Sequence, residues 1–280
     1  MKNTGIYIYS LFVILLAACT TTYTENTAQY PDTEGLNFEN STYYQSSLGE
    51  CDTTGRGGVT ADIKYLEPAV TEESDSQDAP KNLNNFIRGS VVKLINSFTD
   101  STYIEADKRA TTHIPEAYEA FANTYRDFKK DFPESTGCWA VELEGDTVMT
   151  TPKVVVYRLD QYSFTGGAHP NTHTGYYIFD RRNGRSKQIN TFIRDSTELL
   201  RKVELAFRKH EKLPSKATLQ EYGYFLPGNQ FFLPANIAFS HKGMVFLYNP
   251  YEIAAYARGP IEFTIPYSEV EEMIRREQIF

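Results

Sequence analysis

Basic side chains are scarce in this 280-residue chain, and several sequence signatures of catalysis are missing. Lys and Arg total 28 against 36 Asp and Glu, a formal charge of −8, so the phosphate backbone of a nucleic acid is a poor partner. There is no Cys-x-x-Cys, which excludes a zinc ribbon and a thioredoxin-like site. There is no Gly-x-Ser-x-Gly elbow, so an esterase nucleophile is not predicted.

Tryptophan occurs only once, whereas Tyr and Phe occur 20 and 18 times. An aromatic content of 14% fits strands that pack bulky side chains. With 41% hydrophobic and 23% charged residues, the composition is that of a globular protein and excludes disorder over the full length. The length corresponds to one large domain or two small ones.

The N-terminus has the pattern of an export signal. Lys2 precedes an apolar run within residues 5–18, which is shorter than the ~20 residues that span a bilayer. The sequence LAAC at residues 16–19 resembles the lipobox of bacterial lipoproteins, which are cut before the Cys and lipidated on it. We expect a signal peptide at 1–18 and a membrane anchor of palmitate-type acyl chains on Cys19. The alternative is an ordinary secretory signal with a chance Cys.

The residue after Cys19 is Thr20 rather than Asp, which resembles lipoproteins released to the outer membrane of Gram-negative bacteria. We therefore expect a lipid-anchored location in the bacterial cell envelope. In a Gram-negative source, the protein would lie on the outer membrane and face the periplasm.

Two further cysteines, Cys51 and Cys138, remain after the lipidation site is set aside. An exported compartment is oxidising and allows a disulfide between them, although two separate thiols are the alternative because sequence does not give geometry. Residues 19–58 are rich in Thr, Asn, Ser, Gln and Gly and lack sustained periodicity. We expect this range to be a flexible tether.

Hydrophobic periodicity predicts an α+β fold with antiparallel sheets and segregated helices. The predicted helices are 81–98, 114–132, 196–210 and a short one from Ser268. The predicted strands are 59–66, 139–150, 153–164, 174–180, a hairpin within 231–248, and 261–265. A seam near 166–175 divides the chain into an N-terminal subdomain, 59–165, and a C-terminal subdomain, 166–280.

Two passages resemble a known extracytoplasmic region. They are YSFTGGAHPN at 162–171 and FLYNPYEIA at 246–254, the latter followed by Gly259 and the sequence IPY at 265–267. Together they are similar to the two-subdomain region shared by RsiV-type anti-sigma factors and PdaC-type peptidoglycan deacetylases. The resemblance covers roughly residues 59–276, and its C-terminal part is the more specific.

The resemblance implies an envelope binding module. RsiV-type proteins bind lysozyme with this region, and PdaC-type proteins carry it beside a separate catalytic domain. We expect neither a sigma-binding segment nor a deacetylase domain here. The implied partner is a basic protein such as lysozyme, which a negatively charged body would attract. The alternative is a protein that binds envelope glycans, such as peptidoglycan fragments, or modifies peptidoglycan.

The candidate binding residues are His169, Tyr248, Tyr251 and Tyr256. His169 and His173 have the His-x3-His spacing of the zinc ligands in polysaccharide deacetylases, but the Asp-Asp motif of those enzymes does not occur. We therefore expect no catalytic residue, no metal and no cofactor. The alternative role of His169 is to fix a turn. The three tyrosines combine contact area with a polar hydroxyl, and their alternative role is to tie the Asn249-Pro250 turn to the sheet.

Overall fold

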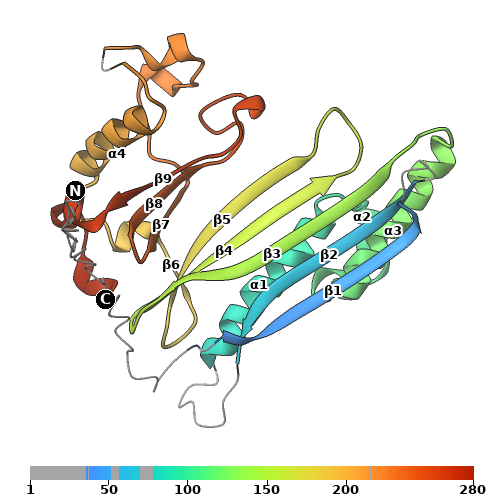
Figure 1. The fold of residues 1–280 in the computed structure, drawn as a ribbon. Helices are drawn as coiled ribbons and strands as arrows, with labels where there is room; N and C mark the ends of the chain where they lie inside the picture. Colours follow the sequence, from blue (N-terminus) through green and yellow to red (C-terminus); the bar gives the residue numbers. More distant parts are fainter. Residues whose placement is uncertain (1–35, 37, 52–56, 70–77, 215) are drawn as a thin grey trace, which may run out of the picture. The chain divides into compact units, whose positions relative to one another are not determined.

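The computed structural model describes residues 36, 38–51, 57–69, 78–214 and 216–280 (Figure 1). The expected signal peptide, Cys19 and part of the expected tether lie outside these residues. Thr33–Phe280 forms one compact unit. Among the described residues, no helix has both the length and the apolar character needed to cross a bilayer.

A six-stranded sheet runs in the order β1-β2-β3-β4-β5-β6. Its strands are β1 (Phe38–Glu50), β2 (Gly57–Pro68), β3 (Cys138–Thr150), β4 (Val154–Phe164), β5 (Asn171–Asp180) and β6 (Ser186–Lys187). β2 and β3 are parallel, whereas every other neighbouring pair is antiparallel. The α+β class is confirmed, but this sheet is mixed rather than antiparallel throughout. The reason is that the chain crosses from β2 to β3 through three helices, which returns it in the same direction.

The three crossover helices are α1 (Asp78–Asn96), α2 (Ser101–Ala106) and α3 (Ile114–Asp131). α1 and α3 pack on one face of the six-stranded sheet (Figure 1). Alternate residues of the strands point into this core, including Ile63, Leu143 and Tyr157. The single Trp, Trp139, belongs to the same core, where its ring lies 5.8 Å from that of Phe121.

β1 lies inside the range expected to be a flexible tether, and it corrects that expectation for residues 38–50. Its side chains alternate between exposed and half-buried, and half-buried Tyr44 contacts the Tyr118 ring on α3 at 6.4 Å. Most of the alternating positions are polar, so the period-2 pattern does not register as a hydrophobic one. Pairing along β2 supplies the hydrogen bonds that this polar segment lacks on its own.

A second, three-stranded antiparallel sheet follows, in the order β7-β8-β9. Its strands are β7 (Asn236–Ser240), β8 (Gly243–Tyr248) and β9 (Ile261–Pro266), and they pack with α4 (Ser196–His210). Asp195 caps α4 by accepting from the backbone N–H groups of Thr197 and Glu198, as its sequence position predicts. The expected final helix from Ser268 is instead a series of short 3-10 turns.

The second sheet packs on part of the other face of the six-stranded sheet, where Met149, Val156 and Ile178 join its core. The expected boundary at residues 165/166 assigns β5 to the C-terminal subdomain, but β5 pairs with β4 along its length. If each sheet defines one subdomain, the boundary between the two subdomains lies after β6. The seam expected at 166–175 falls on the connection between β4 and β5 and on the first half of β5.

Candidate binding site on the open sheet face

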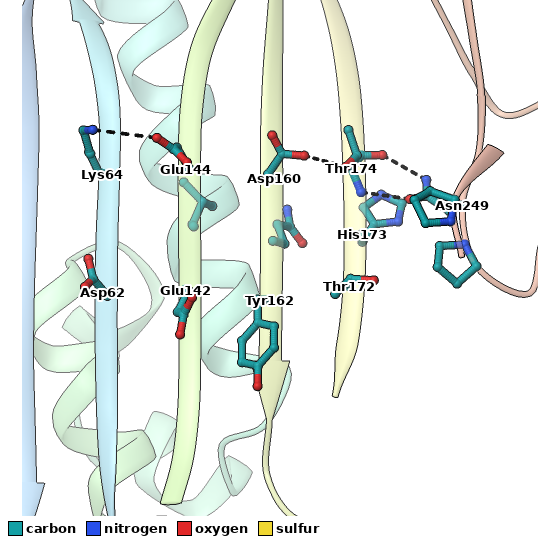
Figure 2. Close-up of a pocket in the computed structure, with 14 residues that line it drawn as sticks. Asp62, Lys64, Glu142, Glu144, Asp160, Tyr162, Thr172, His173, Thr174 and Asn249 are labelled. Atoms are coloured by element: carbon teal, nitrogen blue, oxygen red, sulfur yellow. Dashed lines mark hydrogen bonds and ion pairs between the residues drawn. The ribbon is translucent and has the colours of Figure 1, made fainter. Parts of the chain in front are cut away.

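The second sheet leaves part of the six-stranded sheet uncovered on the side opposite α1 and α3, and we call this part the open face. On each of the strands β2, β3, β4 and β5, alternate residues place polar side chains on this face (Figure 2). These side chains are Asp62, Lys64, Glu142, Glu144, Asp146, Arg158, Asp160, Tyr162, Thr172 and Thr174. Beside them lies a cavity of about 400 Å³, bordered on its other side by Asn249, Pro250 and Pro260.

Strand register arranges the open face in rows across the sheet. One row follows the pairs Lys64 with Glu144, Glu144 with Asp160, and Asp160 with Thr174. A second row, two residues along each strand, follows the pairs Asp62 with Glu142, Glu142 with Tyr162, and Tyr162 with Thr172. Directly opposite residues have Cβ atoms about 5 Å apart, so each row is a continuous line of polar groups.

The open face is acidic. Five of its side chains are carboxylates and two are cations, Lys64 and Arg158. Lys64 reaches Glu144 at 3.7 Å, but both side chains are more than half exposed, so this pair is weak. Glu142 has no hydrogen bond or ion pair with another described residue, and Asp62 accepts only a 3.4 Å hydrogen bond from Gln45. The negative charge at this end of the face is therefore largely uncompensated.

At the β4–β5 end of the open face, the positive charge of Arg158 compensates the negative charge of Asp160. Its guanidinium donates to both carboxylate oxygens of Asp160, at 2.7 and 2.9 Å, and to the Tyr176 hydroxyl at 3.0 Å. It also lies 3.4 Å from Glu262 on β9, so it joins the two sheets. Burial and the neighbouring Glu262 raise the pKa of Tyr176 to about 12, which keeps its hydroxyl a donor to that carboxylate.

Asn249, which borders the cavity, is held in place by hydrogen bonds to Thr174 on β5 and to Glu252 in its own loop. The Asn249 side chain accepts from the Thr174 N–H and donates to the Thr174 carbonyl, each at 2.9 Å (Figure 2). Its own N–H donates to Glu252, which also accepts from the N–H of Ala235. The sequence NPYE thus holds a loop against β5, and these hydrogen bonds fix the cavity wall.

Three of the four candidate binding residues form one aromatic cluster. The ring of His169, from the β4–β5 connection, stacks on that of Tyr256 with centroids 3.9 Å apart. The same imidazole bonds to the Tyr251 hydroxyl at 3.1 Å and to the carbonyl of Pro170 at 2.8 Å. Tyr251 is 58% exposed and has a positive φ of 68°, a strained conformation for a bulky residue.

Tyr248, the fourth candidate, lies in the core. Its side chain is fully buried, and its hydroxyl donates to the carbonyl of Phe232 at 2.6 Å. A ligand on the surface therefore has no access to it. Tyr248 is the last residue of β8, whereas Tyr251 lies in the loop that follows, and the sequence does not show that the strand ends between them.

Cys51 and Cys138 are joined in a disulfide, with their Cα atoms 5.5 Å apart. It ties the residue after β1 to the first residue of β3. In the described ranges, no three His, Cys, Asp or Glu side chains gather in a group that could hold a metal ion. His173 lies on β5 and borders the cavity, whereas His169 lies in the aromatic cluster.

The acidic rows were not among the sequence-predicted site residues. The alternation of Glu142, Glu144 and Asp146 along one strand is visible in the sequence, and it indicates one acidic strand face. The pairing of β3 with β2 and β4 is not visible, because it depends on a parallel crossover through the helices. Without that register, Asp62, Lys64 and Asp160 have no apparent relation to Glu142.

Two family models match the segments of the chain that form this site. Residues 59–172 match the family model described as "Deacetylase PdaC", and residues 181–268 match the one described as "Protein of unknown function (DUF3298)". The chain thus has a segment similar to the PdaC model followed by one similar to the DUF3298 model. This is the two-subdomain region that the sequence resembles, so that expectation is confirmed. The open face from Asp62 to Thr172 lies in the segment that matches the PdaC model, and its Asn249 wall lies in the segment that matches the DUF3298 model. Together the matches support an envelope-associated protein.

Two solved structures share the fold. A DUF3298-family protein from Bacteroides fragilis NCTC 9343 is 22% identical and superposes with a TM-score of 0.65, covering 86% of this chain and 95% of its own. A DUF3298-family protein from Pseudomonas aeruginosa PAO1 is 18% identical with a TM-score of 0.56, covering 87% and 96%. Among curated proteins, none matches the chain.

Proposed function

We propose that this protein is a lipid-anchored envelope protein that binds a basic protein on its open face and catalyses no reaction. The observation that carries the proposal is the acidic row of Asp62, Glu142 and their neighbours, whose charge is largely uncompensated at one end. Carboxylates placed in register next to one another repel, so such a row costs folding stability. A cationic partner surface relieves that repulsion and gains electrostatic attraction.

A lysozyme-like protein is the partner we propose. Such proteins are basic and compact, and the resembled RsiV-type region binds lysozyme. The aromatic cluster of His169, Tyr251 and Tyr256 adds stacking and cation–π surface to the charge of the rows. The exposed, strained Tyr251 is the residue of this cluster that we propose as a direct contact.

In this proposal the membrane anchor is the lipid on Cys19, which would hold the folded body at the membrane surface. The expected tether would then begin after Cys19 and end before β1, which is part of the sheet. Because β1 and the disulfide at Cys51 belong to the fold, a soluble protein for experiments retains residues before 58. A chain that begins at Thr20, after the expected signal peptide and the expected lipidation site, serves this purpose.

Isothermal calorimetry with a basic C-type lysozyme tests the function. We expect a dissociation constant in the micromolar range or tighter that persists at 0.15 M salt, where the Debye length is about 8 Å and diffuse attraction is largely screened. Binding only at low salt would reduce the interaction to general charge attraction and contradict a specific site. Absence of binding at both salt concentrations would exclude lysozyme as the partner.

A further inference from the structure

The outermost strand of the six-stranded sheet, β1, has an outer side that we call the β1 edge. β1 pairs with β2 on its inner side, and no described strand pairs with it on the other. The pairing with β2 runs from Asn40 to Glu50 without a bulge, so the β1 edge is regular over about 35 Å. Edge strands are usually short or interrupted, because a long regular edge is a template for another strand. The role proposed above for the protein does not use this edge.

The β1 edge lacks the features that protect sheet edges from further pairing. Lysines and other charges, prolines and bulges along an edge hinder the approach of a second strand. Residues 40–49 contain no Lys, Arg, Asp, Glu or Pro. In the middle of the strand, the Tyr43 side chain is 58% exposed. The backbone donors and acceptors on this side of β1 are therefore accessible to another strand.

β1 is also held at both ends. At its start, Leu36 is buried and the Phe38 ring lies 6.1 Å from the Tyr157 ring. At its end, the disulfide of Cys51 with Cys138 ties the chain to β3. A strand that is already fixed loses less conformational entropy when it pairs than a frayed one does.

One side of β1 is incompletely packed. Tyr44 and Leu48 point to the helix side, where they pack against the core beneath α1 and α3 but remain half-buried. A strand added at the β1 edge would cover the outer flank of both side chains. Apolar burial would then add to the backbone hydrogen bonds of the new pair.

We propose that the β1 edge binds β1 of a second copy, antiparallel and about a two-fold axis. With the axis at Tyr44, Thr42 of one copy lies opposite Ser46 of the other, and Tyr43 lies opposite Gln45. Hydroxyl pairs of this kind stabilise neighbouring strands, and no like charges meet. A strand of another protein is selected by charge or by pockets, and residues 40–49 supply no charge to select one.

The symmetry of this dimer has a consequence for the open face. A two-fold axis perpendicular to the sheet leaves the same face of both copies on the same side. The two six-stranded sheets join into one continuous sheet, with the helices of both copies on the opposite side. The dimer therefore presents two open faces in the same direction.

Sedimentation velocity at 0.15 M salt, on the chain that begins at Thr20, tests the proposal. We expect a monomer–dimer equilibrium with a dissociation constant in the micromolar range, because one pair of strands buries less area than a standard interface. Backbone amides within residues 41–47 should exchange hydrogen more slowly at high than at low protein concentration. Tyr43→Lys/Ser47→Lys should weaken the dimer at least about tenfold, because the lysines of the two copies repel on one side of the joined sheet.

The matched control is Asn190→Lys/Gln230→Lys, which makes the same change in charge at exposed positions outside both sheets. Its dimer should be as stable as that of the parent chain, and thermal transitions check that both variants fold. The measurement does not involve lysozyme, so it is independent of the test of the proposed function.

Three results would overturn the proposal. A monomer at all concentrations would leave the β1 edge to a strand of another protein. Equal dimerisation of the edge variant and the control, or slower exchange at a site other than β1, would place the interface elsewhere. A chain that is monomeric when it begins at Thr20 but dimeric when it begins at Gly35 would show that residues before β1 cover the edge.

Discussion

Asp62 and Glu142 stand in register on the parallel strands β2 and β3, and their carboxylates face the same side of the sheet. Like charges directly opposite each other destabilise a sheet by about 0.2–1 kcal/mol. We therefore predict that Glu142→Gln raises the free energy of unfolding by a few tenths of a kcal/mol. Urea denaturation at low salt measures this, and a destabilised variant would show that Glu142 has a structural partner after all.

Tyr248 and Tyr251 occupy neighbouring positions of one motif but have opposite roles. Tyr248→Phe leaves the carbonyl of Phe232 without this donor and should cost about 1 kcal/mol of stability with no change in partner affinity. Tyr251→Ala removes an exposed side chain and should weaken lysozyme binding with little loss of stability. Thermal unfolding and calorimetry on both variants separate the roles, and the reverse pattern would contradict this assignment.

At the scale of elements, the disulfide closes the crossover that makes the sheet mixed. Cys51 and Cys138 are 87 residues apart, and their bond spans β2 and all three crossover helices. On the chain-entropy account, a loop of this size contributes about 4–5 kcal/mol. We predict a loss of this order in Cys51→Ser/Cys138→Ser, measured by urea denaturation against the parent chain. A loss below about 1 kcal/mol would indicate that the loop is already constrained in the unfolded chain.

The helices and most strands were predictable because their apolar residues recur with the period of the element. The stripe of α3, with Tyr118, Phe121 and Tyr125 buried, is such a case. β1 was missed because its alternating positions are mostly polar, and the parallel pairing of β2 with β3 was missed because register between distant segments leaves no local signal. The sequence named His169, Tyr251 and Tyr256 as separate candidates in two motifs, but it did not show that they meet. It gave no indication of the acidic rows, which form only when four strands align.

At the scale of the whole molecule, anchoring and binding depend on different parts of the chain. The lipobox-like sequence predicts that Cys19→Ser releases the protein from membranes or blocks its maturation, because the acylated residue is gone. Metabolic labelling with a fatty acid, followed by membrane fractionation, measures this. Unchanged labelling in the variant would contradict lipidation at Cys19.

The most direct test of the account compares two variants of equal charge in their binding to lysozyme at 0.15 M salt. Asp62→Asn/Glu142→Gln removes two of the five carboxylates of the open face, whereas Glu105→Gln/Glu119→Gln removes the same charge from exposed positions on α2 and α3. We predict that the first variant binds at least about tenfold more weakly than the parent chain and that the second binds as the parent does. Equal weakening in both variants would mean that net charge, rather than the open face, attracts the partner, and would contradict the account.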